Sequence, residues 1–171
     1  AALSATPTWM ASQAKFVAVY PTPFWRQQGL SGQVFSRVGP MVEIHDASAT
    51  AETGFALFGF IGVPPEVRSQ HSAEVLQDAC LRQLVSVFGA QAATPDVSYL
   101  KDWAREEWIV SQHDIGESPK HPELDLSVWQ AQLHGMQLHF VGSESAPDEG
   151  GYLEGAVGSV EDFTRTSGLF D

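Results

Sequence analysis

The first hundred residues alternate between short apolar runs and breaker residues. Residues 15–20, Lys-Phe-Val-Ala-Val-Tyr, are rich in β-branched and aromatic side chains and end at a Pro-Thr-Pro segment, which predicts a strand. Glycine and proline bound three further predicted strands, Gln33–Val38, Met41–His45 and Phe55–Ile61. Because side chains alternate between the faces of a strand, Lys15 should share a face with Val17 and Val19. This pattern indicates an antiparallel or mixed sheet.

One long helix is predicted over Ser72–Phe88. Its apolar residues recur at four-residue steps, Glu74 lies near the start, and Gly89 follows the last turn. Cys80 lies on the apolar stripe of this helix, so we expect a packed and unreactive thiol.

The remaining residues predict a more irregular second part. A short strand is expected through Val97 and Tyr99 toward Trp103, followed by a polar loop from Ser111 to about Leu126. After it come a predicted buried strand over Met136–Val141, a small acidic loop from Gly142 to Gly151, and a helix from about Tyr152 to Phe163. The predicted fold class is therefore α+β.

Composition narrows the classes of function. The chain has 171 residues, and 43% of them are hydrophobic, which is enough for a sizeable core. Its net charge of −12 opposes binding to nucleic acid and to anionic membrane surfaces. There is no apolar run of membrane-spanning length, and the single cysteine favours a reducing, cytoplasmic compartment.

The histidines do not have the spacing of metal ligands. His134 and His139 are five residues apart, which matches neither one helix face nor one strand face, so no metal is predicted. In Gly142–Ser145 a glutamate stands at the centre of what would be a nucleophile elbow, which argues against hydrolase chemistry.

A glycine-containing loop lies between the last predicted strand and helix. This arrangement presents backbone N–H groups and a positive helix end to an anionic ligand, although the same glycines would also serve plain turn geometry. Leu138–Ala146 reads Leu-His-Phe-Val-Gly-Ser-Glu-Ser-Ala, and Gly150–Ala156 reads Gly-Gly-Tyr-Leu-Glu-Gly-Ala. These runs resemble the closing motif of the flavin-containing amine oxidases of the monoamine oxidase type, in which Gly-Thr-Glu-Thr-Ala leads to Gly-Tyr-x-x-Gly-Ala.

Upstream blocks resemble the same family in the same order: Tyr20–Arg26, Gly29–Gly32, Gly39-Pro40, Asp46, Leu57–Ile61, Phe88-Gly89, Pro95, Tyr99, Asp102-Trp103 and Glu106–Trp108. The resemblance implies that residues 1–101 are half of a substrate-binding domain, a mixed sheet with a covering helix. Residues 102–171 would be the C-terminal strand, loop and helix of an FAD-binding domain. The glycine-rich fingerprint for the ADP part of FAD does not occur here, so we expect a C-terminal fragment with an incomplete FAD site.

The resemblance assigns catalytic positions to Lys15, Trp103, Tyr152 and His113. Lys15 matches the lysine that holds a water against flavin N5, although a strand lysine reaching solvent is the plain alternative. Trp103 matches the tryptophan lining that water, or it is simply core. Tyr152 matches one wall of the aromatic cage around the substrate amine. His113 stands where the family has the second cage tyrosine, which puts a two-tyrosine cage in doubt; an exposed loop histidine is the alternative.

The cofactor contacts implied by the resemblance are Gly142, Ser143, Gly151, Tyr152 and Leu153. Gln112 replaces the cysteine that binds flavin covalently in the mitochondrial enzymes, so we expect non-covalent FAD. Ser143 and Ser145 keep the hydroxyls of the family's threonines, whereas the sequence does not explain Glu149 in place of a common tryptophan.

The expected activity of the parent protein is oxidation of a C–N bond to an imine, with electrons passing to FAD and then to dioxygen. The fragment alone is expected to be inactive. Two alternatives stay open: a degenerate relative without catalysis, and a flavin desaturase acting on C–C bonds. The expected partners are a small amine, the missing N-terminal part of the same protein and, through exposed apolar surface, further copies of the fragment.

Overall fold

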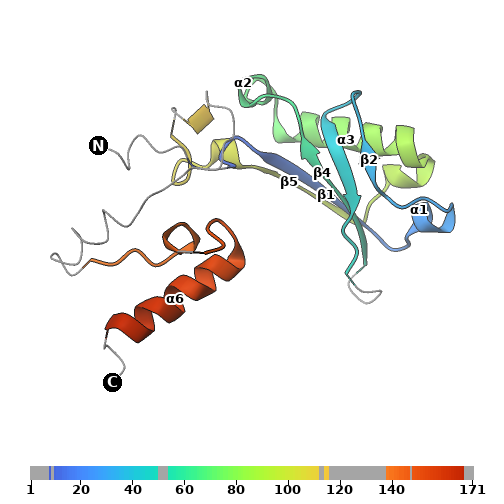
Figure 1. The fold of residues 1–171 in the computed structure, drawn as a ribbon. Helices are drawn as coiled ribbons and strands as arrows, with labels where there is room; N and C mark the ends of the chain where they lie inside the picture. Colours follow the sequence, from blue (N-terminus) through green and yellow to red (C-terminus); the bar gives the residue numbers. More distant parts are fainter. Residues whose placement is uncertain are drawn as a thin grey trace. The chain divides into compact units, whose positions relative to one another are not determined.

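The computed structural model describes residues 8, 10–49, 54–111, 114–115, 138–146 and 148–167. The chain forms two compact units, Ala1–Lys120 and His121–Asp171. The first unit contains a sheet with a helix on it, and the second contains a turn and a helix (Figure 1). Both are described separately below.

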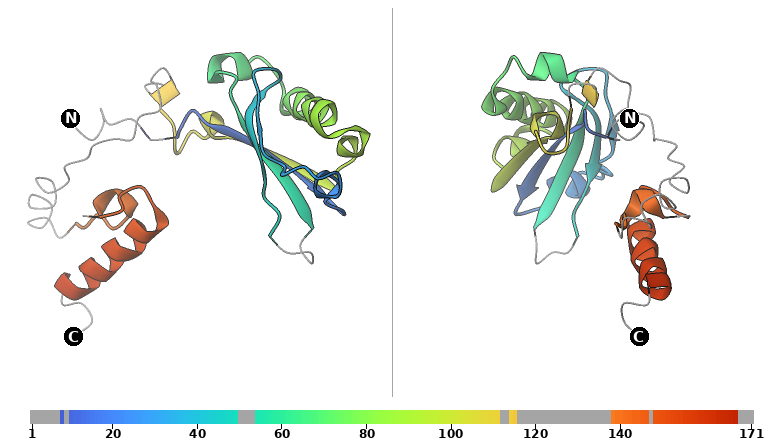
Figure 2. Two further views of the ribbon diagram at one scale, coloured as in Figure 1. Left: turned by 45° about the vertical axis from the view of Figure 1, so that its right-hand side comes forward. Right: turned by 90° about the vertical axis from the view of Figure 1, so that its left-hand side faces the viewer.

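The first unit is built on a five-stranded antiparallel sheet with the order β2-β3-β4-β1-β5. Its strands are β1 (Ala14–Tyr20), β2 (Val34–Phe35), β3 (Met41–Asp46), β4 (Phe55–Ile61) and β5 (Val97–Asp102). Strands β1 and β4 are central, and the two views of Figure 2 show the twist of the sheet around them. The predicted α+β class, with helix and antiparallel sheet, is confirmed.

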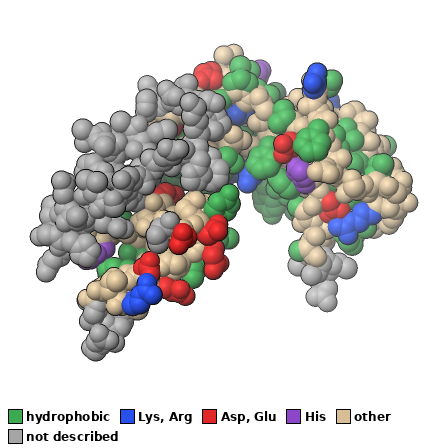
Figure 3. All heavy atoms as spheres, in the orientation of Figure 1, with side chains coloured by type: hydrophobic (Ala, Val, Ile, Leu, Met, Phe, Trp, Pro, Cys, Tyr) green, Lys and Arg blue, Asp and Glu red, His purple; other side chains and the backbone are tan. Residues whose placement is uncertain are grey.

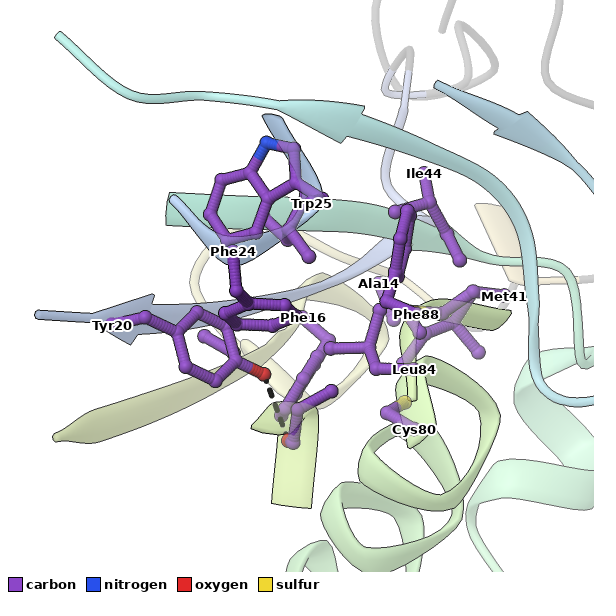
Figure 4. Close-up of a cluster of buried hydrophobic side chains, with 14 residues drawn as sticks. Ala14, Phe16, Tyr20, Phe24, Trp25, Met41, Ile44, Cys80, Leu84 and Phe88 are labelled. Atoms are coloured by element: carbon purple, nitrogen blue, oxygen red, sulfur yellow. Dashed lines mark hydrogen bonds between the residues drawn. The ribbon is translucent and has the colours of Figure 1, made fainter. Parts of the chain in front are cut away.

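The hydrophobic core lies on one face of this sheet. Strand β1 alternates strictly, with Ala14, Phe16, Ala18 and Tyr20 at most 1% exposed and the residues between them only half-buried. On the core side these strand residues pack with Cys80, Leu84 and Phe88 of helix α3 (Ala73–Phe88), as Figure 4 shows. The Tyr20 hydroxyl donates a hydrogen bond of 3.0 Å to the Ala92 carbonyl, and burial raises the pKa of Tyr20 to about 12.

The ends of α3 follow the sequence signals. Ser72 caps the helix by accepting a hydrogen bond from the Val75 N–H, and a hydrogen bond from Ser72 lowers the pKa of Glu74. Gly89 ends the helix with φ +89°, a region that favours glycine. Cys80 is fully buried, and burial raises the pKa of its thiol to about 12, in agreement with the expected unreactive thiol.

Short helices lie between the strands and after the last one. They are α1 (Phe24–Gln27), α2 (Pro65–Arg68), and the 3₁₀ turns η3 (Ala90–Ala93) and η4 (Trp103–Arg105). In the second unit, the 3₁₀ turn η5 (Ser143–Ser145) precedes helix α6 (Leu153–Ser167), which confirms the predicted C-terminal helix. None of the helices in the described parts of the chain is long and apolar enough to cross a membrane.

Three predicted strands differ from the structure. The strand predicted over Gln33–Val38 is only Val34–Phe35, because the chain turns back at Gly39. Strand β5 ends at Asp102, and Trp103 begins a 3₁₀ turn. Within the predicted buried strand over Met136–Val141, the described residues 138–141 are exposed and not in a strand. Sequence pattern signals a tendency for extended structure, but a strand also needs a neighbouring strand to pair with.

Candidate active site

The open face of the sheet, opposite the core, carries Lys15, one of the residues that the sequence singled out. On this face lie the half-buried Lys15, Val17 and Val19 of β1, which confirms that Lys15 shares a face with the two valines. Lys15 lies between Phe60 of β4 and Lys101 of β5. The Lys15 Nζ lies 4.9 Å from the centroid of the Phe60 ring, which is a cation–π contact.

Trp103 lies directly after β5, at the end of the sheet where β1 begins. Its backbone N–H donates a hydrogen bond of 3.0 Å to the carbonyl of Gln13, two residues before Lys15. The Nζ of Lys101 lies 4.8 Å from the centroid of the Trp103 indole ring. The fold therefore brings Lys15 and Trp103, 88 positions apart in the printed sequence, to neighbouring strand ends.

A buried ion pair anchors this end of the sheet. Arg68, only 1% exposed, donates two hydrogen bonds to the carboxylate of Asp102, of 2.9 and 2.7 Å. It also donates hydrogen bonds to the carbonyls of Val63 and Ser12. One guanidinium therefore links three segments: the residues just before β1, the loop after β4 and the end of β5. Full hydrogen bonding is what makes such a buried pair tolerable.

Arg68 was not among the residues predicted from the sequence. Its sequence context, a charged residue in a polar segment after Pro64-Pro65, gives no sign of burial. The only signal was Asp102, which stands directly before Trp103 in a family block, and a carboxylate at the buried end of a strand needs a cation.

The Phe-Trp-Arg block holds the opposite end of the sheet. Asp46 accepts hydrogen bonds from the Trp25 Nε1 at 2.7 Å and from the Arg26 Nε at 2.6 Å. Burial alone would raise the pKa of Asp46, but hydrogen bonds from Arg26, Ser48 and Trp25 outweigh it and hold that pKa well below its usual range. These residues stabilise the end of the sheet at which β3 ends.

In the second unit, the predicted cofactor residues form a turn followed by a helix start. The Ser145 hydroxyl donates to the Gly142 carbonyl at 2.8 Å and accepts from the Gly142 N–H at 3.0 Å, closing the turn. The N–H of Gly151, at φ +83°, donates to the Ser143 carbonyl at 3.3 Å. These contacts bring four of the predicted positions, Gly142, Ser143, Gly151 and Tyr152, together at the N-terminal end of α6.

At the start of α6, two side chains are exposed, while the helix backbone packs closely against the loop that precedes it. Tyr152 is 60% exposed and Leu153 is 89% exposed. A Cβ added to Gly155 would lie 2.2 Å from the carbonyl oxygen of Glu149, so only glycine permits this approach of helix and loop. Glu149 itself adopts φ +54°, and nothing in the structure explains why it replaces tryptophan.

The predicted site residues are thus divided between the units. Lys15 and Trp103 lie in the first unit, and Tyr152 and the glycines lie in the second. His113 and Gln112 lie outside the described residues.

Comparison with known proteins identifies the family to which this chain belongs. The chain matches the model of the flavin containing amine oxidoreductase family over residues 2–160. Because this match covers most of the sequence, the chain belongs to that family, and the resemblance noted in the sequence is confirmed.

Individual relatives agree with this assignment. A probable flavin-containing monoamine oxidase A of Dictyostelium discoideum is 28% identical over 155 residues, covering 88% of this chain and 33% of the relative. Among solved structures, cyclohexylamine oxidase from Brevibacterium oxydans is 31% identical, with a TM-score of 0.65 over 88% of this chain and 33% of that one. Putrescine oxidase bound to putrescine is 27% identical, with a TM-score of 0.63 over 91% and 34%. This chain therefore spans about a third of the relatives' length.

Proposed function

We propose that the protein carrying this chain is an FAD-dependent amine oxidase that converts a C–N bond to an imine. The observation that supports the proposal most is the arrangement of residues at one end of the sheet, in a chain that belongs to this family. There a lysine on β1 and a tryptophan after β5 lie at neighbouring strand ends, and a buried ion pair holds the strands. The relatives' names include a monoamine oxidase, a cyclohexylamine oxidase and a putrescine oxidase, which supports an amine as substrate.

The second unit fits part of a flavin cofactor. Among the described residues beyond its two chain neighbours, the atom nearest to a Cβ added at Gly142 is the Glu144 Oε2, at 3.5 Å, so a ligand can approach the Gly142 backbone. The N-terminal end of α6, a helix of 15 residues, carries a partial positive charge suited to an anionic group. In our proposal Gly142, Ser143, Gly151, Tyr152 and Leu153 contact FAD, and the rest of its site lies in parts of the protein beyond this chain.

FAD would accept the two electrons from the substrate and pass them to dioxygen. Lys15 would place a cation, and a water held by it, beside the reacting flavin nitrogen, where developing negative charge is stabilised. Trp103 would line that water. Tyr152 would orient the substrate amine with its ring, and His113 would face it as the second wall.

Further features of the parent protein belong to the same proposal. Gln112 has no thiol, so FAD would be held non-covalently. Residues 1–101 would form half of a substrate-binding domain and residues 102–171 the C-terminal part of an FAD-binding domain. The chain alone would be inactive and would self-associate through exposed apolar residues such as Leu153 and Val157.

The experiment is to record the visible absorbance of the full-length protein before and after anaerobic addition of mono-, di- and polyamines. We expect bound flavin that an amine bleaches and that acid precipitation releases. Bound flavin that no amine bleaches would favour a desaturase or an inactive relative. Flavin that stays with the precipitated protein would contradict non-covalent binding, and a protein without flavin would overturn the proposal as a whole.

A further inference from the structure

The ion pair between Arg68 and Asp102 places two charges in the interior of the first unit. Arg68 is 1% exposed and Asp102 is 8% exposed. Figure 3 shows other charged side chains of this unit at its surface, where water solvates them. Replacing a buried ion pair by apolar residues is often neutral or even stabilising, because burial strips both charges of water. Stability alone therefore gives little reason for this pair, whereas its fixed geometry gives one.

The carboxylate of Asp102 fixes the backbone that carries Trp103. Its two oxygens accept hydrogen bonds from the Arg68 Nε and Nη2, at 2.9 and 2.7 Å. One of these oxygens, Oδ1, also accepts a hydrogen bond of 3.2 Å from the Ala104 N–H, which caps the 3₁₀ turn η4. Trp103 is the first residue of that turn. The path of the chain through Trp103 is therefore set by the Asp102 side chain.

The same guanidinium holds the segment that leads into Lys15. The Arg68 Nη2 donates a hydrogen bond of 2.8 Å to the carbonyl of Ser12, three residues before Lys15. The next residue, Gln13, accepts the hydrogen bond from the Trp103 N–H. Arg68 therefore ties the approach to Lys15 to the carboxylate beside Trp103.

A guanidinium suits this role better than an ammonium group. Its planar fork donates in fixed directions, whereas an ammonium group is a compact charge on a flexible stem. Arg68 uses Nε, Nη1 and Nη2 to reach both oxygens of Asp102 and the carbonyls of Ser12 and Val63. Movement of one acceptor would bend or lengthen the bonds to the others, so the two strand ends keep one spacing.

The proposed reaction depends on this spacing. In the proposed function, Lys15 would hold a water beside the reacting flavin nitrogen and Trp103 would line that water. Both side chains are only half-buried, so their places depend on the backbone that carries them. A misplacement of about 1 Å in such a constellation can slow an enzyme on the order of 100-fold.

We propose that Arg68 is a positioning residue for amine oxidation. Through Asp102 and the Ser12 carbonyl it holds Trp103 and Lys15 at the separation that the reaction at the flavin requires. Because Arg68 is buried, it acts through these residues and not by contact with substrate or flavin. This inference rests on the proposed function.

The test is anaerobic flavin reduction in the full-length protein by benzylamine, hexylamine or spermidine, whichever reduces the flavin fastest. The quantity measured is the limiting rate per bound flavin at saturating amine, so unfolded protein does not contribute. Arg68→Lys keeps the charge and loses the fork, and we expect this rate to fall about tenfold or more. The amine concentration that gives half of the limiting rate should change by less than about threefold, because Arg68 does not hold the amine.

The control matched for stability is Leu57→Ala. It opens a cavity in the same core, but Leu57 lies on β4 opposite Ala18, away from the strand ends near Trp103. We expect its limiting rate per bound flavin to stay within about twofold of the unmodified protein, although the fold is less stable. Slowing of Leu57→Ala and Arg68→Lys by the same factor would overturn the inference, because a purely structural role would then account for both.

A double variant separates position from buried charge. Arg68→Met with Asp102→Leu removes both charges at once, so neither stays buried without its partner. We expect this protein to fold and to bind flavin, but to reduce it about tenfold more slowly or more, because the fork that links the two segments is gone. An unchanged rate in the double variant or in Arg68→Lys would contradict the inference while leaving amine oxidation intact. If no amine reduced the flavin of the unmodified protein, the proposed function itself would fail, and the inference with it.

Discussion

The two faces of the sheet in the first unit are made by the same strands but follow different rules. On the covered face, strand residues such as Phe16 and Leu57 are fully buried against α3. On the open face, Lys15, Phe58 and Tyr99 stay accessible although two of them are aromatic. A sheet that faced only water would place polar residues there.

We relate the covered face to the stability of the fold and the open face to its function. Most of the covered face is explained by burial, since core residues such as Phe16, Leu57 and Leu84 are apolar and packed together. The open face combines aromatic rings with two lysines, and burial explains neither. Aromatic residues held half-exposed in this way are typical of a surface that meets a ligand or the rest of the protein.

The largest expected effect comes from the ion pair that anchors both faces. Replacing Arg68 by alanine should destabilise the fold by about 3–5 kcal/mol, because the buried Asp102 would lose its two hydrogen bonds from Arg68 and keep only the weaker contact with Arg105. Urea denaturation of the two proteins measures this difference. The control is Arg105→Ala, since its guanidinium is 42% exposed and only 3.5 Å from the same carboxylate; we expect a loss of ~1 kcal/mol or less. Equal losses would contradict the account.

Truncation of two consecutive residues of β4 compares the faces directly. Leu57→Ala should cost about 2–5 kcal/mol, because it opens a cavity in the core. Phe58→Ala, on the open face, should cost about 1 kcal/mol despite its larger side chain, because the site can be filled by water. Thermal unfolding of both variants tests this order, and a larger loss for Phe58→Ala would show that the open face is part of the core.

The covered face of the sheet could be predicted from the sequence better than the open face. The covered face and α3 were predictable, because period-two and four-residue patterns report burial, and Ser72 and Gly89 mark the helix ends. The β-bulge in β3, between Met41 and Glu43, and the buried Arg68 were not predictable, since both depend on contacts with residues far along the chain. Lys15 was predicted only through the family motif, because a lysine on a strand usually reaches solvent.

Acid should lower the stability of the folded protein through Asp46, at the end of β3. Its pKa in the folded protein is held well below its usual range, so the stabilising charge is fully present above the unfolded value of ~3.9. Stability should therefore fall as the pH drops below about 4, as the carboxylate protonates. Asp46→Asn should cost about 1–2 kcal/mol at neutral pH and should reduce this acid sensitivity. Unfolding curves at several pH values give the dependence of stability on pH for both proteins. The same dependence in the unmodified protein and in Asp46→Asn would refute this prediction.

The smallest effect concerns Cys80 on the covered face. Because burial raises its thiol pKa to about 12, native protein should react with a thiol reagent only through unfolding. Stability should decline as the pH rises above the usual thiol value of ~8.5, where the unfolded chain loses its proton first. Reagent uptake in native and denatured protein measures this contrast, and rapid labelling of the native state would contradict the packing of α3.

The central claim is that the open face meets the reacting groups of an amine oxidase. The most direct measurement is the rate of anaerobic flavin bleaching by an amine in the full-length protein carrying Lys15→Met, with Lys101→Met as the matched control on the same face. The account predicts at least about a tenfold slower reaction for Lys15→Met and little change for Lys101→Met, because the proposed mechanism assigns the stabilisation of charge at the flavin to Lys15 and not to Lys101. Equal rates in both variants and the unmodified protein would contradict it.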